Sequence, residues 1–230
     1  MEESLTPNAR GIAHLRKPAL FFLAFYAAWT LRVVLLLPHE GAIQPEIVKR
    51  VYLDTLRILL WIVPLWVYLI RVERVSPIAS LGLNTFPMGR RALESVAIAG
   101  VFFAVLVTVA ITLEHKVTIF QKDVPLGRWP MIFFGMWAAP VIEEIFFRGF
   151  VYRRLREVFR FQTANGINAL LFVSIHIPGW LYLQGLNTGM AANAVGVLII
   201  GWVLGLLMER AQSVWPPILA HFFNNLLWSG

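Results

Sequence analysis

The chain has 230 residues, of which 58% are hydrophobic and 14% are charged, and its mean hydropathy is +0.69. An average soluble domain is about 25% charged, so this composition excludes an ordinary soluble protein and predicts an integral membrane protein. The absence of cysteine excludes disulfides, thiolate metal sites and a cysteine nucleophile.

Seven apolar runs follow one another along the chain, most of them long enough to cross a bilayer as a helix, which takes about 17–25 residues. In chain order they cover residues 19–37, 55–70, 92–113, 130–150, 165–183, 191–208 and 214–228. We therefore expect an all-α fold, a polytopic bundle of about seven transmembrane helices within a range of six to eight. Nothing outside these runs is long enough for a soluble domain, so residues 1–230 are predicted to form a single membrane domain.

The first three runs carry little polar chemistry. Arg32, within the first run, is predicted to extend its charge toward a membrane interface. The proline- and glycine-containing segment 71–91 is predicted to be a loop with a short interfacial helix. Polar residues at membrane depth gather after residue 140. We therefore expect residues 1–128 to be a scaffold and residues 129–230 to be the catalytic half.

The net charge of +7 is explained by membrane topology. If successive runs cross in alternating directions, twelve basic residues fall on one side: Arg10, Arg16, Lys17, Arg71, Arg74, Arg90, Arg91, Arg153, Arg154, Arg156, Arg160 and Arg210. Five fall on the other: Lys49, Arg50, Lys116, Lys122 and Arg128. This bias predicts a cytoplasmic N-terminus. We expect contacts with membrane lipids and none with nucleic acid.

The fourth run contains three charges, Glu143, Glu144 and Arg148. A charged side chain at the centre of a membrane helix costs about 2.5–3.5 kcal/mol even on lenient insertion scales, so these residues predict a functional site. Glu144 and Arg148 lie four residues apart on one helix face and are expected to pair. Glu143 points about 100° away from Glu144 and is left for another helix to partner.

Two further polar motifs lie on later runs: Phe172 with His176, and His221 with Asn225, each spaced four apart. At about 1.5 Å per residue, Glu143 and His221 would lie roughly 10 Å from the cytoplasmic edge and His176 roughly 16 Å. A single intramembrane histidine or asparagine is commonly a structural hydrogen-bonding group between helices. The similar depth of all three motifs favours one shared site instead.

Two kinds of chemistry fit these residues. A glutamate beside a histidine can take a proton from water as general base, while a second histidine and an amide stabilise the oxyanion of a tetrahedral intermediate. The alternative is a divalent metal such as zinc, held by Glu143, His176 and His221 with water as the fourth ligand. The sequence has no His-Glu-x-x-His motif to support a metalloprotease.

The three motifs, in this order and each on its own membrane helix, resemble the CPBP (Abi) family. That family contains the type II CAAX prenyl endopeptidases and many bacterial relatives, some linked to bacteriocin self-immunity. The resemblance covers residues 129–230 and includes Arg148-Gly149 and Gly201-x-x-x-Gly205.

The resemblance implies a role for each motif position. Glu143 would be the general base, assisted by His176, and His221 with Asn225 would form the oxyanion site. Glu144 and Arg148 would support the first motif, and Phe172 would shape the site. Family members have been described both as metalloproteases and as metal-free glutamate proteases. We favour the metal-free mechanism without a cofactor, because the Asn225 amide suits an oxyanion donor better than a metal ligand.

The function expected from this resemblance is an intramembrane endopeptidase of a prokaryotic plasma membrane. It would hydrolyse a peptide bond of a peptide or lipid-anchored protein near the cytoplasmic face, without a covalent intermediate. One alternative is a non-catalytic immunity or partner-binding protein of the same fold. Another is a proton-coupled transporter, but the chain lacks the paired broken helices and inverted halves common in carriers.

Overall fold

The computed structural model describes residues 9–112 and 129–228, and this part of the chain consists of helices joined by turns and short loops, with no strand. The predicted all-α fold is thereby confirmed. In chain order the elements are α1 (Ala9–Leu35), α2 (Leu37–Glu40), α3 (Glu46–Arg57), η1 (Ile58–Ile62), α4 (Val63–Tyr68), η2 (Leu69–Glu73), α5 (Pro77–Ser80), α6 (Arg90–Thr112), α7 (Trp129–Glu144), η4 (Ile145–Tyr152), α8 (Arg153–Arg156), α9 (Phe161–Ser174), α10 (Ile177–Gln184), α11 (Thr188–Ala211) and α12 (Trp215–Trp228).

Each of the seven predicted runs is helical, and five stretches are long and apolar enough to cross a membrane among the described residues. They are Ala13–Leu35, Glu46–Glu73, Arg90–Val109, Phe161–Gln184 and Thr188–Ala211. The other two predicted runs correspond to α7 with η4, which carries Glu143, Glu144 and Arg148, and to α12, which has 14 residues. The polytopic bundle is therefore shown, whereas the number of seven spans stays a prediction.

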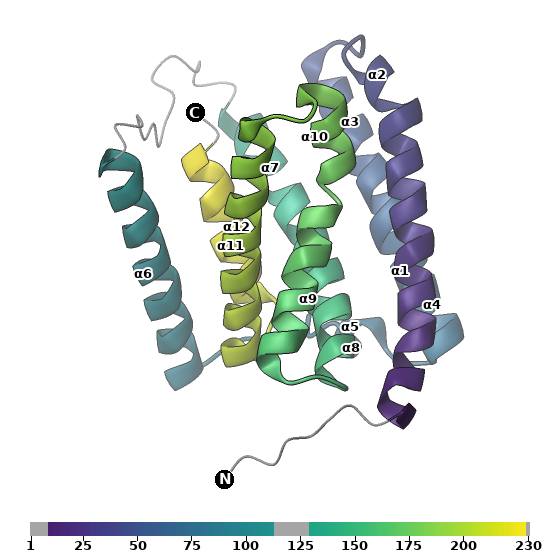
Figure 1. Cartoon of the computed structure of the whole chain (residues 1–230), viewed down its shortest axis with the longest axis vertical. Coiled ribbons are helices and arrows are strands. Elements are labelled where there is room, and N and C mark those ends of the chain that lie inside the picture. The colour runs from purple at the N-terminus through teal and green to yellow at the C-terminus, as the bar shows by residue number, and fades with distance from the viewer. Residues whose placement is uncertain (1–8, 113–128, 229–230) are drawn as a thin grey trace.

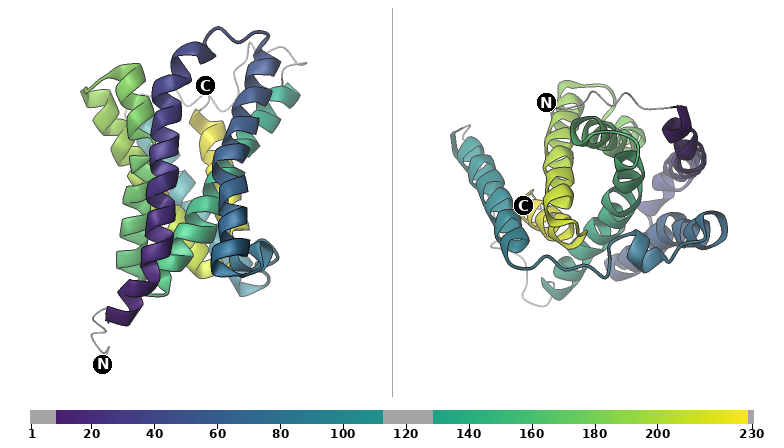
Figure 2. Two further views of the ribbon diagram at one scale, coloured as in Figure 1. Left: turned by 90° about the vertical axis from the view of Figure 1, so that its right-hand side faces the viewer. Right: turned by 90° about the horizontal axis from the view of Figure 1, so that it is seen from below.

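The helices cross the bundle in alternating directions (Figure 1). The starts of α1, α6 and α9, the short helix α8 and the end of α11 all lie at one end, the lower end in Figure 1. These are helix ends that carry most of the predicted excess of arginine. Viewed from that end, α8 and α9 lie between α11 and α12 on one side and α1 and α4 on the other, with α6 outermost (Figure 2).

Aromatic packing fixes η4 inside the bundle. The ring of Phe146 lies 4.2 Å from that of Phe25 on α1 and 5.4 Å from that of Trp61 on η1. The next residue, Phe147, contacts Phe172 of α9 edge-to-face at 5.1 Å. Because lipid is as apolar as these side chains, close packing holds such contacts together in a bilayer. The segment η4 is therefore packed between the N-terminal elements α1 and η1 and helix α9.

The turn from α7 into η4 changes the backbone pattern from α-helical to π-helical at Glu144. Such wide turns are rare and occur frequently at functional sites. Gly149, within η4, allows the segment that contains α5 to approach closely: a Cβ at this position would lie 3.1 Å from the carbonyl oxygen of Leu81. The indole of Trp215 at the start of α12 donates to the carbonyl of Leu83 at 3.0 Å. The predicted loop with a short helix thus runs between η4 and α12.

Arg32 lies in the last turn of α1. It forms an ion pair with Glu40 of α2, and the two side chains are 11% and 5% exposed. Its guanidinium also lies 5.2 Å from the ring centroid of Trp29. The sequence did not predict this ion pair, because the acidic partner lies beyond the end of α1, where the spacing rule for pairs within one helix does not apply. The position of Arg32 near a membrane interface stays a prediction.

Candidate active site

A fully buried ion pair, Glu144 with Arg148, lies at the centre of the site. The guanidinium of Arg148 donates to Oε1 of Glu144 at 3.0 Å, as their four-residue spacing predicts, and both side chains are 0% exposed. A second Arg148 nitrogen donates to the carbonyl of Gly201 on α11 at 2.8 Å. The guanidinium also lies 4.5 Å from the ring centroid of Phe172. Burial of the pair is tolerated because several partners replace the lost water.

His221 of α12 joins this pair to the neighbouring carboxylate. Its Nδ1 lies 2.8 Å from Oε1 of Glu144, the oxygen that also accepts from Arg148. Its Nε2 lies 4.0 Å from Oε2 of Glu143. Because an ionised carboxylate only accepts hydrogen bonds, Nδ1 of His221 must carry a proton and donate a hydrogen bond to Glu144. The imidazole is therefore oriented by one glutamate and directed toward the other.

Glu143 is the carboxylate left without a basic partner of its own. Its side chain is 13% exposed, and among the described residues it makes no ion pair with an arginine or lysine. Its position one residue before Glu144 turns it away from Arg148, as the helical geometry predicts. The ring of Phe172 lies 5.1 Å from the ring of His176 and 5.8 Å from that of His221. The three predicted motifs thus meet in one region of the bundle.

A break in the fifth predicted run presents His176. Helix α9 ends at Ser174 and α10 begins at Ile177, with Pro178 in its first turn. Proline has no backbone N–H, so the carbonyl four residues earlier loses its helical partner. That carbonyl, of Ser174, accepts from the hydroxyl of Tyr26 at 3.3 Å. The next carbonyl, of Ile175, accepts from the indole of Trp29 at 3.0 Å.

These two α1 side chains satisfy backbone groups that lipid could not, as a helix interruption in a membrane requires. His176 itself then hydrogen-bonds within its own chain segment, with Nδ1 2.8 Å from the carbonyl of Phe172. A carbonyl can only accept, so Nδ1 is the protonated nitrogen, and Nε2 of the neutral ring keeps its lone pair. The ring is stacked on Trp180 at 5.3 Å and contacts Phe172 edge-to-face.

Two glycines let α11 approach α9 closely enough to complete this arrangement. A Cβ at Gly205 would lie 1.7 Å from Oδ1 of the buried Asn165, whose amide donates to the carbonyl of Trp202 at 3.0 Å. A Cβ at Gly201 would lie 3.4 Å from the ring of Phe172. Small residues spaced by four are typical of close helix contacts in membranes. The Gly201-x-x-x-Gly205 motif therefore brings the backbone carbonyl of Gly201 within reach of Arg148.

The two asparagines of α12 differ in their surroundings. Asn225, the predicted residue, follows His221 by one turn and is half-buried. Asn224, to which the sequence analysis gives no role, lines a cavity together with His176 and Trp180. Both lie on the His221 side of α12, because residues three and four apart are neighbours on a helix. This spacing is the signal by which Asn224 could have been included.

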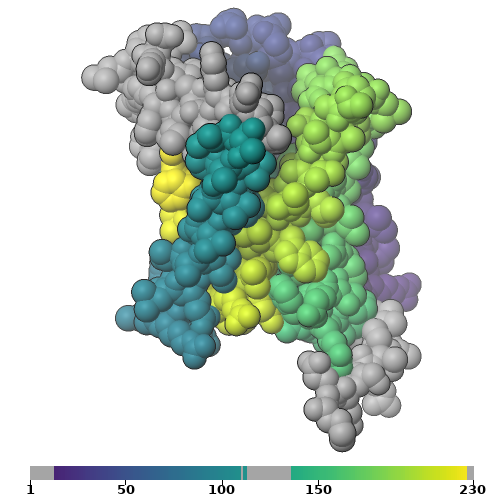
Figure 3. Space-filling model, turned by 60° about the vertical axis from the view of Figure 1, so that its left-hand side comes forward, coloured from purple at the N-terminus to yellow at the C-terminus, as the bar shows by residue number. Residues whose placement is uncertain are grey.

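The cavity has a volume of about 510 Å³ and is predominantly apolar at its wall. It is lined by residues from α6, α10, α11 and α12 together with His176, namely Phe102, Leu106, His176, Trp180, Ala192, Asn193, Gly196, Val197, Ile199, Ile200 and Asn224. Figure 3 shows α6 lying on this face of the molecule between α12 and α11. An apolar cavity with a few convergent polar groups is typical of a binding site.

The candidate metal ligands do not form a ligand set. Within the described ranges 9–112 and 129–228, no three His, Cys, Asp or Glu side chains are grouped so that they could hold a metal ion. Glu143, His176 and His221, the three predicted ligands, are therefore not grouped in this way either. The metal-free mechanism stays a prediction.

Residues 125–227 match the family model described as type II CAAX prenyl endopeptidase Rce1-like. The matched stretch contains all three motifs, from Glu143 to Asn225. No curated protein and no solved structure matches the chain. The Rce1-like family is a protease family, and with five apolar helices the match supports an integral membrane protein that is a CAAX-type intramembrane protease. The predicted resemblance to the CPBP family, which contains these endopeptidases, is confirmed over this stretch.

Proposed function

We propose that the protein hydrolyses a peptide bond of a membrane-associated peptide or lipid-anchored protein, by attack of a water molecule that Glu143 activates. The observation that carries this proposal is that two carboxylates adjacent in sequence, Glu143 and Glu144, have different surroundings. Glu144 is engaged by Arg148 and His221, whereas Glu143 faces the open nitrogen of His221 at 4.0 Å. Two acidic groups held in different environments are typical of a site in which each has a separate task.

The water would lie between Glu143 and His176. Glu143 accepts one proton of the water as general base, and Nε2 of His176 accepts a hydrogen bond from the other. The Nδ1 contact to Phe172 supports this role, because it leaves Nε2 as the acceptor. The oxygen of the water attacks the peptide carbonyl, and the proton on Glu143 passes to the leaving amine. No covalent bond to the protein forms.

His221 and Asn225 would stabilise the oxyanion that forms on the peptide carbonyl. Glu144 accepts from Nδ1 of His221, so an imidazolium would present Nε2–H as a second donor. The Asn225 amide, one turn further along α12, would supply another donor. Arg148 is a positioning residue: it hydrogen-bonds Glu144, and Glu144 in turn orients His221. In this proposed mechanism all the groups that act on the water and the peptide are protein side chains.

The cavity of about 510 Å³ would take the substrate segment next to the scissile bond, because His176 forms part of its wall. We propose a cytoplasmic N-terminus, on the basis of the arginine-rich helix ends gathered at one end of the bundle. The resemblance to a family with many bacterial members is the basis for proposing a prokaryotic plasma membrane. Under this orientation cleavage takes place near the cytoplasmic face.

The experiment is a comparison of terminal peptides by mass spectrometry in cells that express the wild type or Glu143→Gln. The amide is isosteric with the carboxylate but cannot act as a base. Termini of membrane or secreted proteins that are present with the wild type and missing with Glu143→Gln would establish proteolysis and identify the substrates. Glu157→Gln, at an exposed helix end, is the matched control and should leave the termini unchanged.

Unchanged termini with a folded and expressed Glu143→Gln protein would contradict the proposal. They would favour a non-catalytic partner-binding protein of the same fold. A loss of the same termini in the Glu157→Gln strain would also contradict it, because the effect would then come from altered charge or expression.

A further inference from the structure

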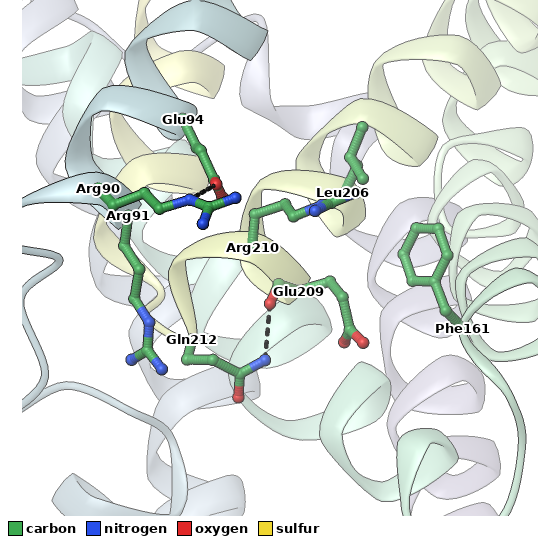
Figure 4. Close-up of a pocket in the computed structure, with 8 residues that line it drawn as sticks. All are labelled: Arg90, Arg91, Glu94, Phe161, Leu206, Glu209, Arg210 and Gln212. Atoms are coloured by element: carbon green, nitrogen blue, oxygen red, sulfur yellow. Dashed lines mark hydrogen bonds and ion pairs between the residues drawn. The ribbon is translucent and has the colours of Figure 1, made fainter.

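A second cavity, of about 750 Å³, lies between α6 and α11 at the end of the bundle where α1 begins (Figure 4). It is lined by side chains from these two helices, from the start of α9 and from the residue after α11, namely Arg90, Arg91, Glu94, Phe161, Leu206, Glu209, Arg210 and Gln212. Three of these eight residues are arginines, and none belongs to the candidate active site.

The two acidic residues in this cavity are already neutralised. Glu94 accepts from Arg90 on the same helix at 2.7 Å. Glu209 accepts from the hydroxyl of Tyr152 at 2.6 Å and from the guanidinium of Arg156 at 2.8 Å. By contrast, no side-chain hydrogen bond and no ion pair within 4.0 Å involves the guanidinium of Arg91 or Arg210 in the described part of the chain, although Arg210 interacts electrostatically with the neighbouring Glu209. The cavity therefore carries an excess of positive charge contributed by two different helices.

Its position corresponds to the level of lipid headgroups. The apolar span of α6 begins at Arg90 and that of α11 ends at Ala211, so the arginines lie where the hydrocarbon ends. Exposed apolar side chains continue from the cavity along both helices: Leu93 is 72% exposed, Val96 70% and Trp202 38%. A headgroup bound at the arginines could thus lay its acyl chains against lipid-facing helix surface.

We propose that this cavity binds the phosphate of an anionic phospholipid, with Arg91 and Arg210 as its ligands. Guanidinium groups bind phosphate oxygens through paired, charge-assisted hydrogen bonds. The bound headgroup connects α6 to α11 across the seam between them. Helix α6 packs mainly on α11 and α12 and has few buried residues, so such a bridge would hold it against the bundle. The inference is independent of the proposed proteolysis.

The test is native mass spectrometry of the full-length protein in detergent, with phosphatidylglycerol or phosphatidylcholine of identical acyl chains. The wild type should retain phosphatidylglycerol at least about tenfold better than phosphatidylcholine, since each arginine near an anionic headgroup contributes to the attraction. The double variant Arg91→Gln/Arg210→Gln should lose this preference. Arg16→Gln/Arg71→Gln removes two exposed arginines that fall on the same predicted side of the membrane and should keep it.

Three outcomes would overturn the proposal. The first is equal retention of both lipids by the wild type, and the second is an equal loss of preference in both double variants. The third is displacement of the lipid by millimolar inorganic phosphate, which would indicate a site for soluble anions. Arg91→Lys/Arg210→Lys keeps the charge but not the planar fork, and it should retain part of the preference if the glutamine variant proves unstable.

Discussion

Two of the arginine–glutamate pairs among the described residues, Arg32–Glu40 and Glu144–Arg148, lie one in each half of the chain, and they differ in what surrounds them. Arg32 and Glu40 join the end of α1 to α2, and each is the other's charged partner beside Trp29. Glu144 and Arg148 lie inside the bundle, and their partners include His221 and the carbonyl of Gly201. We call the first pair closed, because Arg32 and Glu40 are each other's charged partners. The second pair also forms hydrogen bonds with further polar groups.

A buried charge is therefore not by itself the mark of a functional site in this molecule. Burial of an ion pair is favoured when its members hydrogen-bond one another, and both pairs contain such a bond. What distinguishes the second pair is the additional carboxylate next to it, Glu143, which makes no ion pair with an arginine or lysine among the described residues and faces His221 at 4.0 Å. The following predictions test whether catalytic activity depends on Glu143 in particular or on any buried charged side chain.

The largest effect is expected from Glu143→Gln. Removal of a general base lowers the rate by about a hundredfold to ten-thousandfold, so we expect kcat to fall by about a thousandfold with little loss of stability. The measurement is cleavage of a substrate found by the terminal-peptide comparison, with the purified variant. Glu40→Gln is the matched control: it removes a carboxylate from the closed pair and should leave kcat unchanged. Similar losses of kcat in both variants would end the distinction between the two pairs.

The second prediction concerns stability. Arg148→Met leaves Glu144 buried beside His221 without its strongest partner, and removal of one member of a buried pair costs about 3–5 kcal/mol. We expect a smaller loss for Arg32→Met, because that pair lies at a helix end and is partly exposed. Thermal unfolding in detergent compares the two.

The double variant Glu144→Leu/Arg148→Met should recover part of the lost stability, because it removes both buried charges, while activity stays absent. A stable Arg148→Met protein with normal activity would show that the pair is dispensable.

The third prediction separates the two asparagines of α12. Loss of one oxyanion donor costs about a hundredfold or more in kcat, so Asn225→Ala should lower kcat by that amount with little change in KM. Asn224→Ala removes a side chain from the cavity wall and should raise KM with little change in kcat. The reverse pattern would assign the oxyanion role to Asn224.

The relations that the sequence predicted correctly are those that lie within one helix. The pairing of Glu144 with Arg148 follows from their spacing, and the all-α bundle follows from the apolar runs. Contacts between helices could not be predicted in this way. The hydrogen bond from His221 to Glu144 joins residues 77 positions apart, and it depends on how α12 packs on α7.

The break at His176 lies between these two cases. Pro178 in the sequence signals that a helix cannot continue unchanged, so the interruption could have been predicted from a single residue. The groups that make it tolerable could not, because Tyr26 and Trp29 are 148 and 146 residues away from the carbonyls they satisfy. The same holds for Arg32, whose partner lies on another element.

The smallest effect is expected at this break, and it tests whether the N-terminal half influences the site. Trp29→Phe removes the donor to the Ile175 carbonyl but keeps an aromatic ring, and loss of such a hydrogen bond costs about 1 kcal/mol. If α1 only supports the fold, stability alone should fall. We expect kcat to fall several-fold as well, because the released carbonyl lies directly before His176 and its reorientation would turn the imidazole. Trp66→Phe, on α4, is the control without a bond to this segment; equal loss of kcat there would show that the N-terminal half acts through general packing.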